Sequence, residues 1–277
     1  ITQSLVEKTL GMTDLPLLSE PNLQQQLVEI GYQGKKLEEL ENLSATEKAN
    51  MLFIVQDPYT SYYDAKVVRD FVALTQKLGF EPIILPFKPN GKAMHIKGLL
   101  TRFSKTAKTQ AEFLNRVAKL NVPLVGVDPA IVLSYRDEYK EALGDSRGDF
   151  HVLTAHEWLT NQLESNALQS AVKNIAKSDC NFEWHLFPHC TESTFMPNSP
   201  KEWQNIFAQF GQTLKVEKVG CCGMAGVFGH EVQNQTMSKD IYDVSWGKKL
   251  QGKDPNYCLA TGYSCRSQVK RYEKAIL

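Results

Sequence analysis

The sequence predicts an α/β fold that consists of two tandem parallel-sheet lobes. The first observation behind this prediction is an alternation of apolar runs with stretches of helical periodicity, which starts near residue 50 and again near residue 180. Such alternation is typical of a parallel sheet that is covered by helices. The second observation is that the later half of the chain repeats the order of the earlier half, which indicates an internal duplication.

The first lobe contains three predicted strands with helices between them. The strands are the apolar runs NMLFIV (50–55), EPIILPF (81–87) and VPLVGV (122–127). Between the first two, residues 64–78 place a row of apolar side chains on one helical face. A second helix is centred on Phe113, Leu114 and Val117, and a third follows the last strand to about Leu143.

The second lobe repeats this order. Its predicted strands are EWHLFP (183–188), LKVEKV (214–219) and YCLATG (257–262). Trp203, Ile206 and Phe210 have the spacing of one helical face between the first two strands. A glycine-rich loop and a polar helix follow the second strand, and a helix that begins near Cys265 closes the chain.

Three landmarks occur at matching intervals in the two lobes. Gly91 lies 34 residues after Asp57, and Gly223 lies 33 residues after Cys190. Ile131 follows Gly91 by 40 residues, and Cys265 follows Gly223 by 42. The spacing predicts two Rossmann-like lobes, at residues 49–165 and 166–277, preceded by a connecting segment over residues 1–48. Every cysteine of the second lobe is replaced by another residue type in the first.

Composition excludes several classes of function. Lysine plus arginine and aspartate plus glutamate both number 31, so the charge gives no support for binding to nucleic acid. No apolar run approaches the roughly 18 residues that a membrane span needs. The first residues, ITQSLVEKTL, contain no initiator Met and no signal-peptide pattern, and we expect the chain to be a piece of a longer polypeptide.

The cysteines gather at one end of the chain. There are six of them, all within the last hundred residues: Cys180, Cys190, Cys221, Cys222, Cys258 and Cys265. A secreted disulfide scaffold is usually short and spreads its cysteines widely. The clustering therefore indicates a reducing compartment, the cytoplasm, and a local chemical role. Cys180 fits the role of a small buried apolar residue.

The segment VGCCGMAGVFGHE (219–231) admits three interpretations. A phosphate-binding loop is disfavoured, because the sequence has neither G-x-G-x-x-G nor G-K-[ST]. A thiol redox centre is disfavoured as well, because a disulfide between adjacent cysteines needs a strained ring and no C-x-x-C motif occurs. The third interpretation is a metal site.

Four cysteines follow three predicted strands and are therefore expected to meet. Because ligands bind at the carboxyl ends of parallel strands, Cys190, Cys221, Cys222 and Cys265 are the predicted metal ligands. Four thiolates suit an iron–sulfur cluster or a Cys₄ zinc site. Adjacent cysteines reach two irons of a cluster more easily than one zinc ion, which favours iron–sulfur. Zinc and a metal-free site stay as alternatives.

Glycines and histidines complete the predicted site. Gly223 and Gly226 lack side chains, so backbone N–H groups next to them are able to approach cluster sulfurs. His189 precedes Cys190 and His230 ends the loop, and each is either a cluster contact or a polar residue at a loop mouth. Cys258 lies inside a predicted strand and is more simply a core residue.

These motifs resemble those of a known family. PHC, GCCG and SC resemble the cysteine-rich "CCG" domain of the heterodisulfide reductases and of the iron–sulfur component of glycolate oxidase. GMTDLPLLS (11–19), VDPAIVLSYRDEY (127–139), GCCGMAGVFGHE (220–231) and TGYSCRSQ (261–268) are most similar to the C-terminal part of large FAD- and iron–sulfur-containing D-2-hydroxy acid dehydrogenases, of the D-lactate or D-2-hydroxyglutarate type.

The resemblance implies an oxidoreductase segment that carries electrons. It implies a [4Fe–4S] cluster in this chain, with FAD and a ferredoxin-like domain elsewhere in the same polypeptide. It also implies an acceptor such as quinone or cytochrome, and a cytoplasmic location that is peripheral to the inner membrane through the parent protein. This segment alone is not expected to turn over substrate. The alternative is a zinc-binding or metal-free docking module.

The chain departs from the family pattern at two places. The family usually ends in C-x-x-C, but position 262 is glycine, which leaves open whether Cys258 or a histidine is a further ligand. In the first lobe, Asp57, Pro89 with Asn90, and Ile131 stand where the family carries ligands. We expect Ile131 to fill this former site with apolar bulk and Asp57 to accept hydrogen bonds from loop N–H groups.

Overall fold

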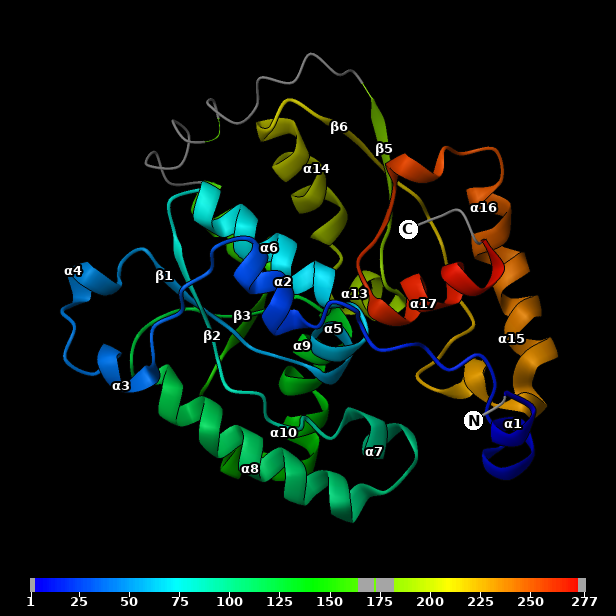
Figure 1. Ribbon diagram of the computed structural model, residues 1–277, viewed down its shortest axis with the longest axis horizontal. Helices are drawn as coiled ribbons and strands as arrows, with labels where there is room; N and C mark the ends of the chain where they lie inside the picture. Colours follow the sequence, from blue (N-terminus) through cyan, green and yellow to red (C-terminus); the bar gives the residue numbers. More distant parts are fainter. Residues whose placement is uncertain (1–2, 164–171, 173–181, 274–277) are drawn as a thin grey trace. The chain divides into compact units, whose positions relative to one another are not determined.

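The computed structural model describes residues 3–163, 172 and 182–273 (Figure 1). Contacts divide the chain into two units, which we name by their sheets. The four-stranded unit contains residues 18–177, and the three-stranded unit contains residues 1–17 and 178–277. Cys180 and the predicted lobe boundary between residues 165 and 166 lie outside the described residues. The predicted lobe boundaries stay a prediction.

The four-stranded unit has a parallel sheet with its first strand near the centre. The strands are β1 (Met51–Ile54), β2 (Glu81–Ile84), β3 (Leu124–Gly126) and β4 (Val152–Thr154), in the order β2-β1-β3-β4. Phe53 pairs in parallel with Ile83 on one side and with Leu124 on the other. All four residues of β1 are buried, as expected for a strand with neighbours on both sides and helices on both faces.

Helices connect these strands in sequence order. Three short helices precede the sheet: α2 (Leu23–Glu29), α3 (Leu37–Leu40) and α4 (Ala45–Lys48). The others are α5 (Pro58–Tyr62), α6 (Ala65–Lys77), α7 (Lys92–Ile96), α8 (Leu100–Ala118), α9 (Pro129–Arg136), α10 (Glu138–Leu143) and α11 (Ala155–Leu163), with a 3₁₀ turn at Gly144–Arg147. Helix α8 packs beside α10, as Figure 1 shows.

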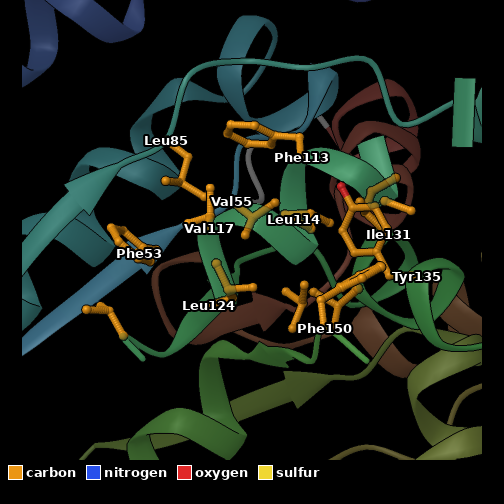
Figure 2. Packing of buried hydrophobic residues seen from close by; sticks show 14 of the residues in the cluster. Phe53, Val55, Leu85, Phe113, Leu114, Val117, Leu124, Ile131, Tyr135 and Phe150 are labelled. Carbon is orange, nitrogen blue, oxygen red and sulfur yellow. The ribbon is translucent and has the colours of Figure 1, made fainter. Parts of the chain in front are cut away.

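Apolar side chains from strands and helices form the core of this unit (Figure 2). Phe53 and Leu124 come from the sheet, Leu114 comes from α8, and Ile131 and Tyr135 come from α9. Ile131 is 3% exposed, which confirms the expectation that this position supplies apolar bulk.

The three-stranded unit has a smaller parallel sheet of similar connectivity. Its strands are β5 (Glu183–Phe187), β6 (Thr213–Val216) and β7 (Cys258–Ala260), in the order β6-β5-β7. Its helices are α1 (Gln3–Leu10), α13 (Cys190–Phe195), α14 (Ser199–Gln209), α15 (Gln235–Tyr242), α16 (Lys248–Leu250) and α17 (Tyr263–Tyr272). A π-helical turn (Asp243–Gly247) joins α15 to α16, and 3₁₀ turns lie at Phe228–His230, Val232–Asn234 and Pro255–Tyr257.

The predicted α/β class with two parallel sheets is confirmed. In each unit the first strand of the sheet lies between the second and the third. β4 and α11 were not predicted; β4 is three residues long and, unlike β3, does not stand in a longer apolar run. The predicted strands also ran two to three residues too far at several ends, into loops that leave the sheet.

The three landmarks lie at similar places in the two units. Asp57 and Cys190 each stand three residues beyond the last residue of a strand. Gly91 and Gly223 both adopt positive φ, at 78° and 86°. Ile131 and Cys265 are both the third residue of their helices. The internal duplication nevertheless stays a prediction, because similar connectivity also arises in unrelated parallel sheets.

Among the helices in the described ranges, none combines the length and apolar character that crossing a bilayer requires.

Candidate functional site

Four cysteines are placed by the carboxyl ends of the three strands of the smaller sheet. Cys190 begins α13 directly after β5, Cys221 and Cys222 lie in the loop after β6, and Cys265 lies in the first turn of α17 after β7. Because the strands are parallel and adjacent, all three loops leave the sheet at the same edge.

The four side chains interact as a chain of neighbours. Cys221 lies between Cys190 and Cys222 and interacts with the side chains of both. Cys222 in turn contacts Cys265. The structure therefore brings together all four cysteines that the sequence singled out, across 75 residues of chain. Cys265 is fully buried and Cys222 is 3% exposed.

The pKa shifts of the clustered cysteines run in opposite directions. The thiols of Cys190 and Cys222 hold the pKa of Cys221 well below its usual range, and the N–H of Gly223, 3.3 Å from the sulfur, adds to the effect. The same contacts raise the pKa of Cys190 and of Cys222, with burial as a further cause. These directions favour the thiolate form at Cys221 over its two neighbours, and a thiolate is the form that binds metals.

The glycine loop packs tightly against α15. Gly223 has φ of +86°, and a Cβ atom there would lie 2.2 Å from the backbone oxygen of Ser238. Ser238 Oγ donates to the Gly223 carbonyl at 2.8 Å and accepts from Gln268 Nε2 at 2.8 Å. Gly226 also adopts positive φ, +72°. This Ser238–Gln268 support was missed from sequence, because neither residue has a recognisable motif.

The two loop histidines differ in their surroundings. His230 is 5% exposed and its Nδ1 lies 3.2 Å from the carbonyl oxygen of Thr13, which ties the loop to residues 1–17. Burial, followed by the charge of Arg271, lowers the pKa of His230. His189 instead caps α13, beside the cysteines: the N–H of Thr191 donates to its Nδ1 at 3.2 Å.

Cys258 lies apart from the other described cysteines. It is the first residue of β7, at the amino end of the strand, whereas the four clustered cysteines follow carboxyl ends. Its thiol donates to the carbonyl of Asp254 at 3.4 Å, and it belongs to the apolar core of the unit. Cys258 is a core residue, as the sequence suggested.

The donor set suits a soft metal, but the side chains do not form a finished ion site. In the part of the chain that the structure describes, no three or more His, Cys, Asp or Glu side chains are arranged to hold a metal ion. A tetrahedral zinc ion needs its sulfurs about 2.3 Å from one point, whereas these thiols follow one another in a row. Any metal would therefore bind with rearrangement of the side chains.

Polar groups occupy the comparable strand ends of the four-stranded unit. Asp57 caps α5 and accepts from the N–H groups of Tyr59 and Thr60 at 2.8 and 3.0 Å, which confirms its expected role. Asp128 caps α9 in the same manner, after the adjacent strand β3. Burial, and then the charge of Asp128, raises the pKa of Asp57 to about 6.

Comparison with curated proteins gives several long matches, whereas no family model matches the chain. The chain is 80% identical over all of its residues to a D-2-hydroxyglutarate dehydrogenase of Haemophilus influenzae, of which it covers 27%. It is 56% identical over 99% of its length to the protein of the same name from Escherichia coli, of which it covers 26%, and 38% identical over 98% to that of Pseudomonas putida, again over 26%. The chain thus spans about a quarter of the length of these relatives.

Proposed function

We propose that this chain is the iron–sulfur electron-transfer segment of a D-2-hydroxy acid dehydrogenase. The relatives are named for D-2-hydroxyglutarate, which makes this acid the first choice of substrate for the parent enzyme and D-lactate the second. FAD in another part of the polypeptide would oxidise the acid, and a ferredoxin-like domain would link it to this segment. A quinone or cytochrome is the proposed final acceptor.

One observation carries the proposal: four cysteines from three strand ends contact one another. Four thiolates are the usual ligand number of an iron–sulfur cluster, and soft sulfur ligands select such clusters over hard cations. The adjacent pair Cys221–Cys222 occupies the middle of the row, where it is able to reach two different irons. Cys190 and Cys265 would complete the set from either end.

The surrounding residues supply what such a cluster requires from a protein. The N–H of Gly223 already donates to the Cys221 sulfur, and hydrogen bonds to sulfur stabilise the reduced, more negative form. Burial of Cys222 and Cys265 keeps water from two of the four sulfurs. When bound, an iron–sulfur cluster supplies one-electron transfer, which neither thiols nor the folded chain provide alone.

The proposal is tested by anaerobic reconstitution of two matched variants. Cys222→Ser removes a proposed ligand, whereas Cys258→Ser places the same hydroxyl at an equally buried position of the same unit, outside the row of thiols. We expect the wild type and Cys258→Ser to take up iron and sulfide in equal amounts and to turn brown. Cys222→Ser should bind little of either.

Two results would count against this function. A colourless wild-type protein that holds one zinc ion would favour the structural or docking module instead. Equal iron loading of Cys222→Ser and the wild type would show that the adjacent pair is not part of the site, and the ligand assignment would then fail.

A further inference from the structure

One helical element contacts each of the three chain segments that carry the clustered cysteines. This element, which we call the frame, consists of residues 235–247, that is, α15 and the π-helical turn that follows it. Its side chains reach the glycine loop, the end of β5 that precedes Cys190, and α17, which holds Cys265. A segment with contacts to all three is placed to fix where the cysteines stand.

The frame holds the backbone before the adjacent cysteines at Gly220. The Gly220 N–H donates to Ser245 Oγ at 2.7 Å, and Trp246 Nε1 donates to the Gly220 carbonyl at 3.0 Å. Successive side chains of an α-helix diverge by about 100°, and the wider π-helical turn reduces this angle. Ser245 and Trp246 lie in that turn, and together they bind both polar groups of one backbone residue.

The frame holds the backbone after the adjacent cysteines at Gly223. Ser238 Oγ donates to the Gly223 carbonyl at 2.8 Å, while the Gly223 N–H donates to the Cys221 sulfur at 3.3 Å. Ser238 is fully buried, and a Cβ atom on Gly223 would meet the Ser238 backbone oxygen at 2.2 Å. The frame therefore acts on a cysteine sulfur through one intervening residue.

Two further contacts anchor the frame itself. The Trp246 ring is fully buried and packs against Phe187, the last residue of β5, with the ring centroids 5.3 Å apart. Gln268 of α17 is fully buried as well, and its Nε2 donates to Ser238 Oγ at 2.8 Å. Because buried hydrogen bonds and packed rings have few alternative arrangements, these contacts make the frame rigid where it meets the glycine loop.

We propose that Ser238, Ser245 and Trp246 are positioning residues that pre-organise the Cys221–Cys222 pair for metal binding. The backbone of the pair is fixed without a metal, so binding requires rotation of the cysteine side chains and no ordering of the loop. With respect to the iron–sulfur cluster, this inference rests on the proposed function. Fixation of the backbone is a property of the metal-free chain and is tested separately.

Amide hydrogen exchange of the reduced, metal-free protein tests this fixation. Ser245→Ala removes the acceptor of the Gly220 N–H, so this amide should exchange about five- to tenfold faster, as the loss of one hydrogen bond implies. Ser245→Thr keeps the hydroxyl group and should restore the slow exchange of the wild type. An unchanged Gly220 rate in Ser245→Ala would overturn the inference.

Two controls separate local release of the loop from general destabilisation. Thr236→Ala, at an exposed position of the frame, should leave the exchange rate of the Gly220 amide unchanged. The amide of Leu186, in the central strand β5, should exchange at the same rate in all of these proteins. If Ser245→Ala accelerated exchange at Leu186 as much as at Gly220, the frame would support the fold only, and the proposal would fail.

Reconstituted protein tests the positioning role at the cluster. Ser238→Ala should loosen Gly223 and weaken its hydrogen bond to the Cys221 sulfur, which should shift the reduction potential to a more negative value. Thr236→Ala should keep the potential of the wild type. An unchanged potential in Ser238→Ala at the iron content of the wild type would contradict the positioning role.

The two kinds of measurement also separate this inference from the proposed function. A wild type that takes up no iron would remove the proposed function, whereas the exchange rates of Gly220 would still decide whether the frame fixes the loop. The same rates decide it if Ser238→Ala does not fold, because Ser245 is only half-buried and its variants change one hydroxyl group.

Discussion

Asp57 shows how burial competes with hydrogen bonding at a single residue. Its carboxylate accepts from two backbone N–H groups and from the Thr60 hydroxyl, and these contacts favour the charged form. Asp57 is also 2% exposed and close to Asp128. Burial and the charge of Asp128 outweigh the hydrogen bonds, so the pKa of Asp57 rises to about 6. The folded protein therefore binds this proton more tightly than the unfolded chain does.

This shift predicts a pH dependence of stability with a definite sign. Because the folded pKa lies above the ordinary value of 3.8, the stabilising contribution is present at low pH and is lost as pH rises from about 4 to about 6. The loss should amount to about 2 to 3 kcal/mol of unfolding free energy. Asp57→Asn keeps the helix cap and should remove this slope in urea unfolding. The control Glu41→Gln, at an exposed carboxylate, should leave the pH dependence of the unfolding free energy unchanged. If Asp57→Asn kept the pH dependence of the wild type, Asp57 would not be its source.

Two glycines of the three-stranded unit, Gly223 and Gly252, distinguish backbone strain from close packing. Both have positive φ, 86° and 77°, so alanine at either position should cost about 1 kcal/mol of stability from the backbone alone. A Cβ atom at Gly252 would meet nothing within 4 Å, whereas one at Gly223 would meet the Ser238 carbonyl oxygen, which should add about 1 to 3 kcal/mol. Thermal unfolding of the two variants measures the difference, and equal losses would show that the loop is not held against α15.

At the scale of elements, the parallel sheet explains why the cysteine site was predictable. Apolar runs located six strands, and the carboxyl ends of adjacent parallel strands converge whatever the loops contain. The sequence alone therefore predicts that Cys190, the pair Cys221–Cys222 and Cys265 meet. The hydrogen bonds between the frame and the glycine loop were not predictable, because they depend on the distance between a helix and a loop and not on local sequence. The short strand β4 was not predictable either, because its apolar residues Val152 and Leu153 do not extend into a longer apolar run.

Glu192 links the elements that carry the site. Its carboxylate accepts from Ser199, Trp203 and Thr261, and so ties α13 to α14 and to the loop before α17. Glu192→Ala would leave these donors without the carboxylate, and we expect a loss of about 3 kcal/mol of stability together with reduced iron uptake. Glu192→Gln should recover part of both. Normal iron uptake by a destabilised Glu192→Ala protein would show that the network supports the fold only.

At the scale of the whole molecule, two units of similar connectivity differ in chemistry. One unit places cysteines at its strand ends, whereas the other places helix-capping aspartates and the apolar Ile131 at the comparable positions. Apolar packing and caps stabilise a fold without a bound group, whereas the row of half-buried and buried thiols would gain its main interactions from the proposed metal. We therefore assign the proposed electron transfer to the three-stranded unit alone.

The most direct test of this assignment is the amount of iron and acid-labile sulfide per chain after anaerobic reconstitution of three proteins. We predict about four of each in the wild type, as in a [4Fe–4S] protein, and the same amounts in Asp57→Ala. Cys222→Ser should hold almost none. Loss of iron from Asp57→Ala as complete as that from Cys222→Ser, or a wild type without iron and sulfide, would contradict the assignment.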